Sequence, residues 1–491
     1  MQEAVRPPVR WWPFALVTPL AVAALVAAKL HAAGGTHSSF TRLAEVFVAL
    51  VVICAVWVIP ASWSLCAGLA LSMFGGNWQN LGLPSSVAPD RFVLGLALLA
   101  IAVRAPAAAN RPRMRFRPLY AVMYVAGAYA IASAIGYGTI TQHAEIFDLL
   151  DRMGILDWFV FIFAPVVFVT AADRKVFLGT LVGMGIYLGF TGIFEILGPH
   201  SLVFPRYINN PKLGIHWGRA RGPFLEAEVM GTALFGCILG SMIALRTFAS
   251  RRARGLALLA IGVCTVSLIL TFDRTTWLAV GIAAPLTLAM VPELRRYLLP
   301  IVAVTAAVVG ISYFAIPTVR EHIQLRANDS QTLRDRQAVD GAAEAMIMAR
   351  PLFGFGWGRF IPVAQTYYQT STAYSLWLEK PIPVHDVYLS IATDLGLVGL
   401  ALWLVIVLGG VGGAVFSRRA PPEMRPWRIA LGALFLEWLI AALTSPISGS
   451  FQVVIIWLWA GIIVGTERQA RAQRSPATNG SPIFQDLRRR R

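Results

Sequence analysis

Apolar residues occur in long runs that recur along the whole chain, separated by short segments with charged residues, proline or glycine. Runs such as 255–271 and 297–316 approach the roughly 20 residues with which a helix crosses a bilayer. The run 61–74 is short and follows Pro60 directly, which is typical of either a complete span or a re-entrant helix. The pattern predicts an all-α polytopic membrane protein with 12–14 transmembrane helices. The fourteen runs are 13–30, 43–59, 61–74, 91–103, 119–136, 157–171, 176–196, 229–246, 255–271, 275–290, 297–316, 387–408, 428–443 and 451–466.

The composition supports this class of protein. Hydrophobic residues make up 57% and charged residues 14% of the 491 residues, whereas a soluble domain carries about 25% charged residues. Because the apolar runs continue through the whole chain, a secreted enzyme with one cleaved signal peptide is excluded. We expect the cysteines to pack as small buried side chains, without a disulfide framework or a cysteine-based metal site. All four lie inside apolar runs, at Cys54, Cys66, Cys237 and Cys264.

The net charge of +17 reports the orientation of the chain in the membrane. When the loops are assigned alternately to two sides, one side holds 26 of the 42 basic residues and only six acidic residues, an excess of +20. Cytoplasmic loops are enriched in Lys and Arg, so this side is predicted to be the cytoplasm and to contain both termini. The excess accounts for the whole net charge, and a nucleic-acid partner is therefore not needed to explain it.

One long hydrophilic segment stands apart from the apolar runs and divides the chain. Residues 317–386 are close to neutral and are placed outside the cytoplasm by the charge pattern. Their aromatic residues and the helix-like stretch 332–349 argue against disorder. We therefore expect an N-terminal transmembrane bundle (1–316), this large, partly helical extracytoplasmic loop, C-terminal transmembrane helices (387–466) and a flexible basic cytoplasmic tail (467–491).

Arginines on the predicted outer side are the first candidates for chemistry. Arg274 lies between two apolar runs in T-F-D-R-T-T-W-L. It either snorkels to the membrane surface paired with Asp273 or presents its planar guanidinium to a phosphate in a cavity.

The loop G-R-A-R-G-P-F-L-E-A-E (218–228) supplies a second group of polar residues. Arg219 and Arg221 alternate, so they share one face if the chain is extended. Glu226 and Glu228 lie near the start of the next helix. The group forms either an ordinary interfacial basic loop or part of a substrate-binding site.

The large loop adds more arginines and a glycine-rich segment, P-L-F-G-F-G-W-G-R-F (351–360). Its glycine spacing does not fit a dinucleotide fingerprint, and a tight glycine turn between two helices fits better. His385 lies at the outer mouth of the next span, where it is either structural or reactive. No pair of histidines has the spacing of a zinc site, so we expect no metal. The loop arginines are Arg320, Arg326, Arg334 and Arg336.

Several arginines and one histidine are thus predicted to meet on one side of the membrane. Arginines bind a pyrophosphate with paired hydrogen bonds, and a neutral histidine can accept a proton from an attacking hydroxyl. This combination suits glycosyl transfer from a diphosphate-linked donor.

Residues 200–410 resemble the superfamily of O-antigen ligases and polymerases, which are polytopic membrane glycosyltransferases. The resemblance rests on three motifs in family order: R-x3-L from Arg274, R-x14-P-L-F-G-x-G from Arg336, and H-x10-G-L-x-G from His385. The G-P-F segment at 222–224 is also similar to that of polymerase-type members.

The resemblance implies an undecaprenyl-diphosphate-linked glycan donor, a saccharide acceptor and no cofactor. It further implies that Arg274 and Arg336 hold the diphosphate, that His385 is the general base, and that the anomeric carbon is inverted without a metal. Two positions depart from the family pattern: Asp340 stands where Trp is frequent, and Asp386 where Asn or Ser is frequent.

Three functions fit the sequence: a ligase, a repeat-unit polymerase, or a polysaccharide transporter or flippase. Transporters usually place ionisable residues near the middle of the membrane and often have two repeated halves. Here the candidate charges lie near the outer surface, and no internal repeat is visible. A multi-pass glycosyltransferase of the cytoplasmic membrane, with its active site facing outside and contributing to cell-surface polysaccharide assembly, is therefore favoured.

Overall fold

The computed structural model describes residues 51–83, 88–104, 116–290, 331–368, 383–444 and 450–474, together with Arg295, Leu299, Ala303 and Phe314. The described residues form helices joined by loops and contain no strand, which confirms the all-α prediction. The expected span 13–30, residues 43–50 of the expected span 43–59 and almost all of 297–316 lie outside the described residues.

Each of the other expected spans is a helix or the greater part of one in the structure. The helices are α3 (Ala61–Leu71), α4 (Pro89–Arg104), α5 (Pro118–Gly136), α6 (His143–Asp151), α7 (Ile155–Val167), α8 (Ala171–Leu197), α9 (Ala227–Thr247), α10 (Arg251–Leu270), α11 (Arg274–Met290), α14 (Gln331–Ala349), α15 (Phe360–Ala364), α16 (Val387–Val407), α17 (Gly413–Val415), α18 (Arg425–Ala441) and α19 (Ser450–Arg474).

Six helical segments of the described chain are long and apolar enough to cross a membrane, so the protein is a multi-pass membrane protein. The short run 61–74 forms α3, which ends at Leu71, followed by a 3-10 turn. The helix-like stretch 332–349 of the large loop is α14, as the sequence predicts. The six long segments are Pro118–Gly136, Ala171–Leu197, Ala227–Thr247, Arg251–Leu270, Val387–Val415 and Phe451–Arg471.

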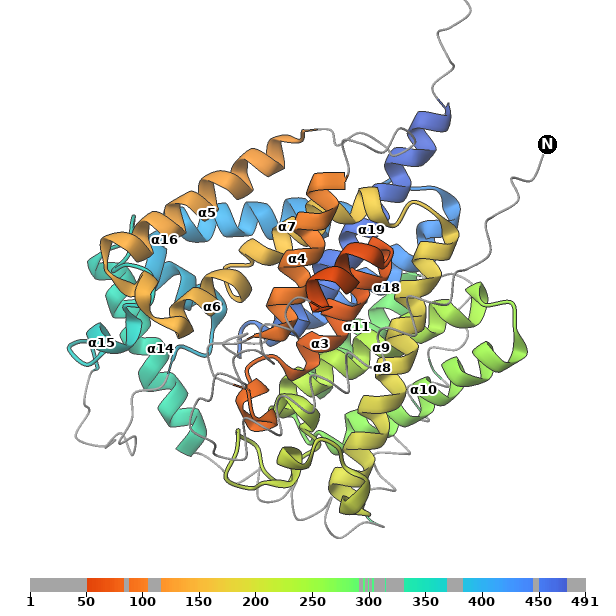
Figure 1. Cartoon of the computed structure of the whole chain (residues 1–491). Coiled ribbons are helices and arrows are strands. Elements are labelled where there is room, and N and C mark those ends of the chain that lie inside the picture. Colours follow the sequence, from red (N-terminus) through yellow and green to blue (C-terminus); the bar gives the residue numbers. More distant parts are fainter. Residues whose placement is uncertain are drawn as a thin grey trace, which may run out of the picture.

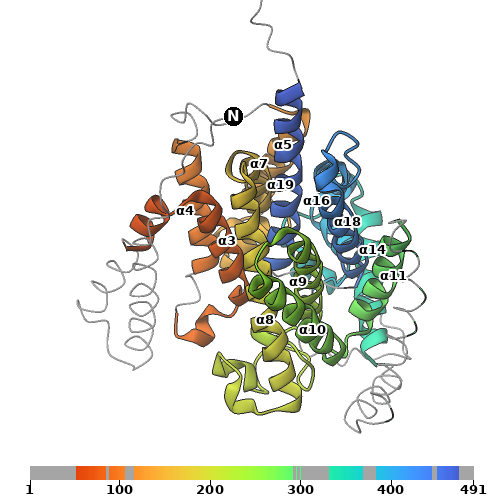
Figure 2. The same ribbon diagram turned by 90° about the vertical axis from the view of Figure 1, so that its right-hand side faces the viewer.

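Helix α19 forms the centre of the bundle. Its apolar window is 94% buried, against 28% for α5, so α19 packs against protein on nearly all sides whereas α5 lies at the periphery. Helices α7, α9 and α18 pack against it. Figure 2 shows α3 and α4 on one side of α19, and α11, α14, α16 and α18 on the other.

Among the described residues, loops that the charge pattern assigns to one side of the membrane lie at one end of the bundle (Figure 1). Asn77 donates to the carbonyl groups of Pro223 and Phe224, and Trp78 donates to Asp90 at 2.8 Å. These contacts join the 197–228 loop to the start of α4. At the opposite end, Ser417 donates to Glu467 at 2.6 Å and Arg468 donates to Tyr120 at 2.6 Å. The alternation of the loops agrees with the sequence, and the side that faces outward stays a prediction.

Candidate active site

A break in α16 organises the candidate site. Gly396 lies inside this helix with φ 68° and ψ −175°, a conformation that L side chains rarely adopt. The break leaves the carbonyl groups of Thr393 and Asp394 free to accept the amides of Phe355 and Gly356, both at 2.9 Å. The glycine-rich segment of the large loop therefore docks onto α16 through its main chain. It forms a tight glycine turn, because Gly354, Gly356 and Gly358 all have positive φ.

This docking places α14 beside the start of α16. A small apolar core joins Val339 of α14 to Phe355 and to Val384, which directly precedes His385. Asp386 caps α16 by accepting the Leu389 amide at 3.0 Å, and this cap fixes the backbone next to His385.

Arg336 and His385 are brought together by this arrangement. Burial lowers the pKa of His385 below its usual 6.5, and the charge of the nearby Arg336 lowers it further. The imidazole is therefore neutral at pH 7, as a general base must be. The Nε of Arg336 is buried and has no hydrogen-bond partner among the described residues.

The corner between α10 and α11 contains an ion pair between an arginine and an aspartate. Arg219 is 3% exposed, and its Nη1 lies 3.5 Å from Oδ1 of Asp273. The other carboxylate oxygen of Asp273 caps α11 by accepting the Thr276 amide at 2.8 Å. Arg274 is the first residue of α11 and is exposed. Asp273 thus forms an ion pair with Arg219, and the alternative that Arg274 also pairs with Asp273 stays a prediction.

The two parts of the site lie at the same end of the bundle. The hydroxyl of Thr444, just after α18, lies 3.3 Å from that of Thr275, next to Arg274. The carbonyl of Ala442 accepts the amide of Val387 at 2.9 Å, two residues after His385. The end of α18 thus links the first turn of α11 to the first turn of α16.

Arg221 has a different environment from Arg219. It is completely buried, and it donates to the carbonyl groups of Ile208 at 3.0 Å and Asn210 at 2.9 Å, while its Nε lies 3.4 Å from Glu195. The expectation that Arg219 and Arg221 share a face is wrong, because the chain is not extended here and each arginine has its own partners. Arg221 holds the 206–225 loop together.

The remaining predicted ligands are placed as follows. Glu226 immediately precedes α9, and burial raises the pKa of its carboxyl group. Glu228 lies buried in the first turn of α9. One turn further, Gly231 packs closely against Thr276 of α11, so the starts of α9 and α11 are neighbours. Arg334 lies in the first turn of α14, and Arg320 and Arg326 fall outside the described residues.

Comparison with known families identifies the segment that carries these features. Residues 256–404 match a family described as O-Antigen ligase. Over this segment the chain is similar to the O-antigen ligase family. The segment contains Arg274, Arg336 and His385, whereas the loop with Arg219 precedes it. No curated protein matches the chain.

The two departures from the O-antigen ligase motifs prove to be neighbours. Burial raises the pKa of Asp340, and the nearby negative charge of Asp386 raises it further, against the opposing charge of Arg336. The residues around His385 are thus richer in carboxylate groups than the resemblance implies.

The ion pair of Arg152 with Asp394, at 3.0 Å, was missed by the sequence analysis. Arg152 also stacks on the ring of Trp357, with its guanidinium carbon 4.4 Å from the ring centroid. The signal was present in the sequence, because Asp394 is an ionisable residue inside an apolar span. The ion pair links the end of α6 to α16, and the stacking on Trp357 joins the same arginine to the glycine-rich segment.

The described residues contain no group of three or more His, Cys, Asp or Glu side chains placed to hold a metal ion. Polar chemistry at the site is supplied by guanidinium, imidazole and carboxylate groups.

Proposed function

We propose that the protein is a glycosyltransferase of the cytoplasmic membrane. It transfers a glycan from an undecaprenyl-diphosphate-linked donor to a saccharide acceptor at the outer face, during assembly of a cell-surface polysaccharide. The position of Arg336 beside a neutral His385 is the observation that supports this proposal most. The family match supports the same class of function.

In this proposal His385 is the general base. The acceptor oxygen forms a bond to the anomeric carbon while the bond from that carbon to the diphosphate oxygen breaks. The hydroxyl proton passes to the imidazole of His385. Because the acceptor attacks from the face opposite the leaving diphosphate, the anomeric configuration inverts.

Arg219, Arg274 and Arg336 bind the donor diphosphate. Nε and Nη2 of Arg219 and Nε of Arg336 are buried donors that have no hydrogen-bond partner among the described residues. A buried donor without a partner costs on the order of 1–3 kcal/mol, and phosphate oxygens satisfy such donors well. The reaction needs no metal in this scheme, because the arginines supply the positive charge.

The acceptor distinguishes a ligase from a polymerase, since both use the same chemistry. A ligase transfers the glycan to a terminal acceptor, and a polymerase transfers it to another repeat unit. We assign Glu226, Glu228 and Arg334 to the binding of saccharide groups around the donor site. Arg221 stabilises the conformation of the 206–225 loop and is not assigned to substrate binding.

The test is transfer by the purified full chain, reconstituted in vesicles with an undecaprenyl-diphosphate-linked oligosaccharide and a saccharide acceptor. His385→Ala is expected to reduce the rate by about 10²–10⁴-fold. His143→Ala, which changes an exposed histidine at the start of α6, is the matched control and is expected to keep the wild-type rate. EDTA is expected to have no effect.

Normal transfer by His385→Ala would remove His385 as the base and make Glu226 and Glu228 the next candidates. Loss of transfer in EDTA would rule out the metal-free scheme. Movement of the intact lipid-linked donor across the vesicle membrane without transfer would favour the flippase.

A further inference from the structure

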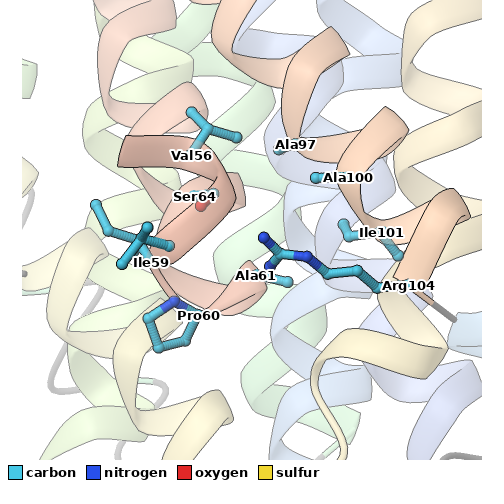
Figure 3. A pocket seen from close by; sticks show the side chains of 10 residues that line it. Val56, Ile59, Pro60, Ala61, Ser64, Ala97, Ala100, Ile101 and Arg104 are labelled. Carbon is cyan, nitrogen blue, oxygen red and sulfur yellow. The ribbon is translucent and has the colours of Figure 1, made fainter. Parts of the chain in front are cut away.

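A small cavity lies at the end of the bundle opposite the candidate active site. It has a volume of about 100 Å³ and lies between the helical residues 51–58, α3 and α4. Val56, Ala97 and Ile101 form apolar walls, and Arg104 closes one side. Figure 3 shows the guanidinium of Arg104 reaching across the cavity toward Ala61.

Two polar groups of this cavity point to an anionic ligand. The guanidinium of Arg104 lies over the ring of Trp57, 4.7 Å from its centroid, and forms no ion pair with a carboxylate of the described chain. Ser64 lines the cavity and is only 4% exposed, and its hydroxyl oxygen is buried without a hydrogen-bond partner among the described residues. Buried polar groups without partners are rare in native proteins, so a ligand oxygen is the natural partner for the Ser64 hydroxyl. The half-buried guanidinium of Arg104 supplies positive charge to the same cavity.

The surroundings of the cavity indicate that the ligand comes from the bilayer. Trp57 and Val58 are 45% and 44% exposed, and Leu99 and Val103 of α4 are 57% and 56% exposed. Large apolar side chains at this exposure form a surface that faces lipid in a membrane protein. Beyond Arg104, the sequence up to Arg117 contains four more arginines, which the charge pattern assigns to the cytoplasmic side. Basic pockets between helices on that side suit acidic lipid headgroups.

We propose that this cavity binds the phosphate of one anionic glycerophospholipid from the inner leaflet. Arg104 provides the charge-assisted hydrogen bonds, and Ser64 donates its hydroxyl to a phosphate oxygen. A cavity of about 100 Å³ accommodates a phosphate group but not a whole lipid. The acyl chains therefore lie along the exposed apolar surface of α4. The site is separate from the proposed transfer site, and its test does not depend on glycosyl transfer.

The experiment is native mass spectrometry of the full chain in detergent, titrated with dioleoylphosphatidylglycerol or with dioleoylphosphatidylcholine. The two lipids share their acyl chains and differ in net charge. The wild-type chain is expected to retain one phosphatidylglycerol about tenfold more tightly than phosphatidylcholine, as one charge-assisted interaction implies. Arg104→Gln removes the charge, and Ala61→Leu fills the cavity from a half-buried position. Both variants are expected to lose this preference.

Arg252→Gln is the matched control, because it removes an exposed arginine of α10 that does not line the cavity. It is expected to keep the preference. Thermal unfolding of each variant reports whether the chain is folded, and Ala61→Leu leaves every charge in place.

Equal retention of the two lipids by the wild-type chain would overturn the proposal. The proposal would also be overturned if folded Arg104→Gln and Ala61→Leu still preferred phosphatidylglycerol. Loss of this preference in Arg252→Gln would overturn it as well. Displacement of the bound lipid by inorganic phosphate would identify a soluble phosphate as the occupant and would also overturn it.

Discussion

The amide of Leu397 donates to the carbonyl of Pro351 at 2.7 Å, and this bond joins two sequence motifs into one structural unit. Leu397 follows Gly396 of the H-x10-G motif, and Pro351 begins the P-L-F-G-x-G motif. The break at Gly396 exposes main-chain groups in the middle of an apolar helix, and the large loop satisfies them. The motif glycines therefore determine where Arg336 and His385 lie relative to each other, because they fix α14 against α16.

Gly396→Ala is expected to disturb this unit. A Cβ atom at this position would lie 2.2 Å from the carbonyl oxygen of Leu352, and φ is 68°. The left-handed conformation alone costs about 1–2 kcal/mol for a residue other than glycine, and the contact adds to this cost. We expect a lower melting temperature and a loss of most transfer activity, measured on the reconstituted protein.

Gly413→Ala is the control for this change. Gly413 is the first residue of α17, near the other end of the same span, and its Cβ would have no heavy atom within 4 Å. It is expected to leave the activity and the melting temperature near those of the wild-type chain. Wild-type activity in Gly396→Ala would show that the docked loop does not position the site.

The acidic limb of the pH profile is expected to report His385. Because burial and Arg336 lower its pKa, kcat/KM should rise with pH through a value below 6.5 and be constant near pH 7. Arg336→Gln removes one cause of the shift, so its residual activity should show an acidic limb at higher pH.

Binding of the donor is expected to change the pKa of His385. The diphosphate neutralises the charge of Arg336, so the limb in kcat, which reports the complex, should lie at higher pH than the limb in kcat/KM. An acidic limb that does not move in Arg336→Gln would separate Arg336 from the base.

Arg219 and Arg221 are expected to respond differently to the same substitution. Arg221→Gln removes a guanidinium that holds several carbonyl groups and Glu195, so it should destabilise the fold by about 3–5 kcal/mol. Arg219→Gln should weaken donor binding by about 2–5 kcal/mol if a bound diphosphate loses its buried partner. Thermal unfolding and donor binding by the purified variants measure the two effects. Unchanged donor affinity in Arg219→Gln would remove Arg219 from the site.

The orientation of the chain is tested by cysteine labelling with a membrane-impermeant reagent. Met348 of α14 is 83% exposed and Phe416 beyond α17 is 72% exposed, so each accepts a cysteine without disturbing the core. The exposed Cys54 is first replaced by serine. In intact cells with a permeabilised outer envelope, Met348→Cys should be labelled and Phe416→Cys should not.

Ser371→Cys, inside the loop 317–386 but outside the described residues, should behave like Met348→Cys. Labelling of Phe416→Cys alone would reverse the orientation.

The helices were predictable from the sequence because their apolar runs are long, and α14 was predictable from its composition. The meeting of Arg336 with His385 was predictable from the order of the motifs. The break in α16 was not, because the run 387–408 is apolar throughout and a glycine leaves a helix only where a tertiary partner compensates it. The different environments of Arg219 and Arg221 were not predictable for a similar reason. Their partners, Asp273 and Glu195, belong to distant segments of the chain.

The hydrogen bonds of Arg221 have a consequence for the energetics of the neighbouring loop. They close the 206–225 loop around a buried guanidinium through carbonyl groups of the chain itself. Arg219, carried by that loop, is therefore preorganised, and the entropy of ordering it is lost during folding. A donor that meets Arg219 in this state binds without a large rearrangement of the loop, and its affinity reflects the contacts it makes.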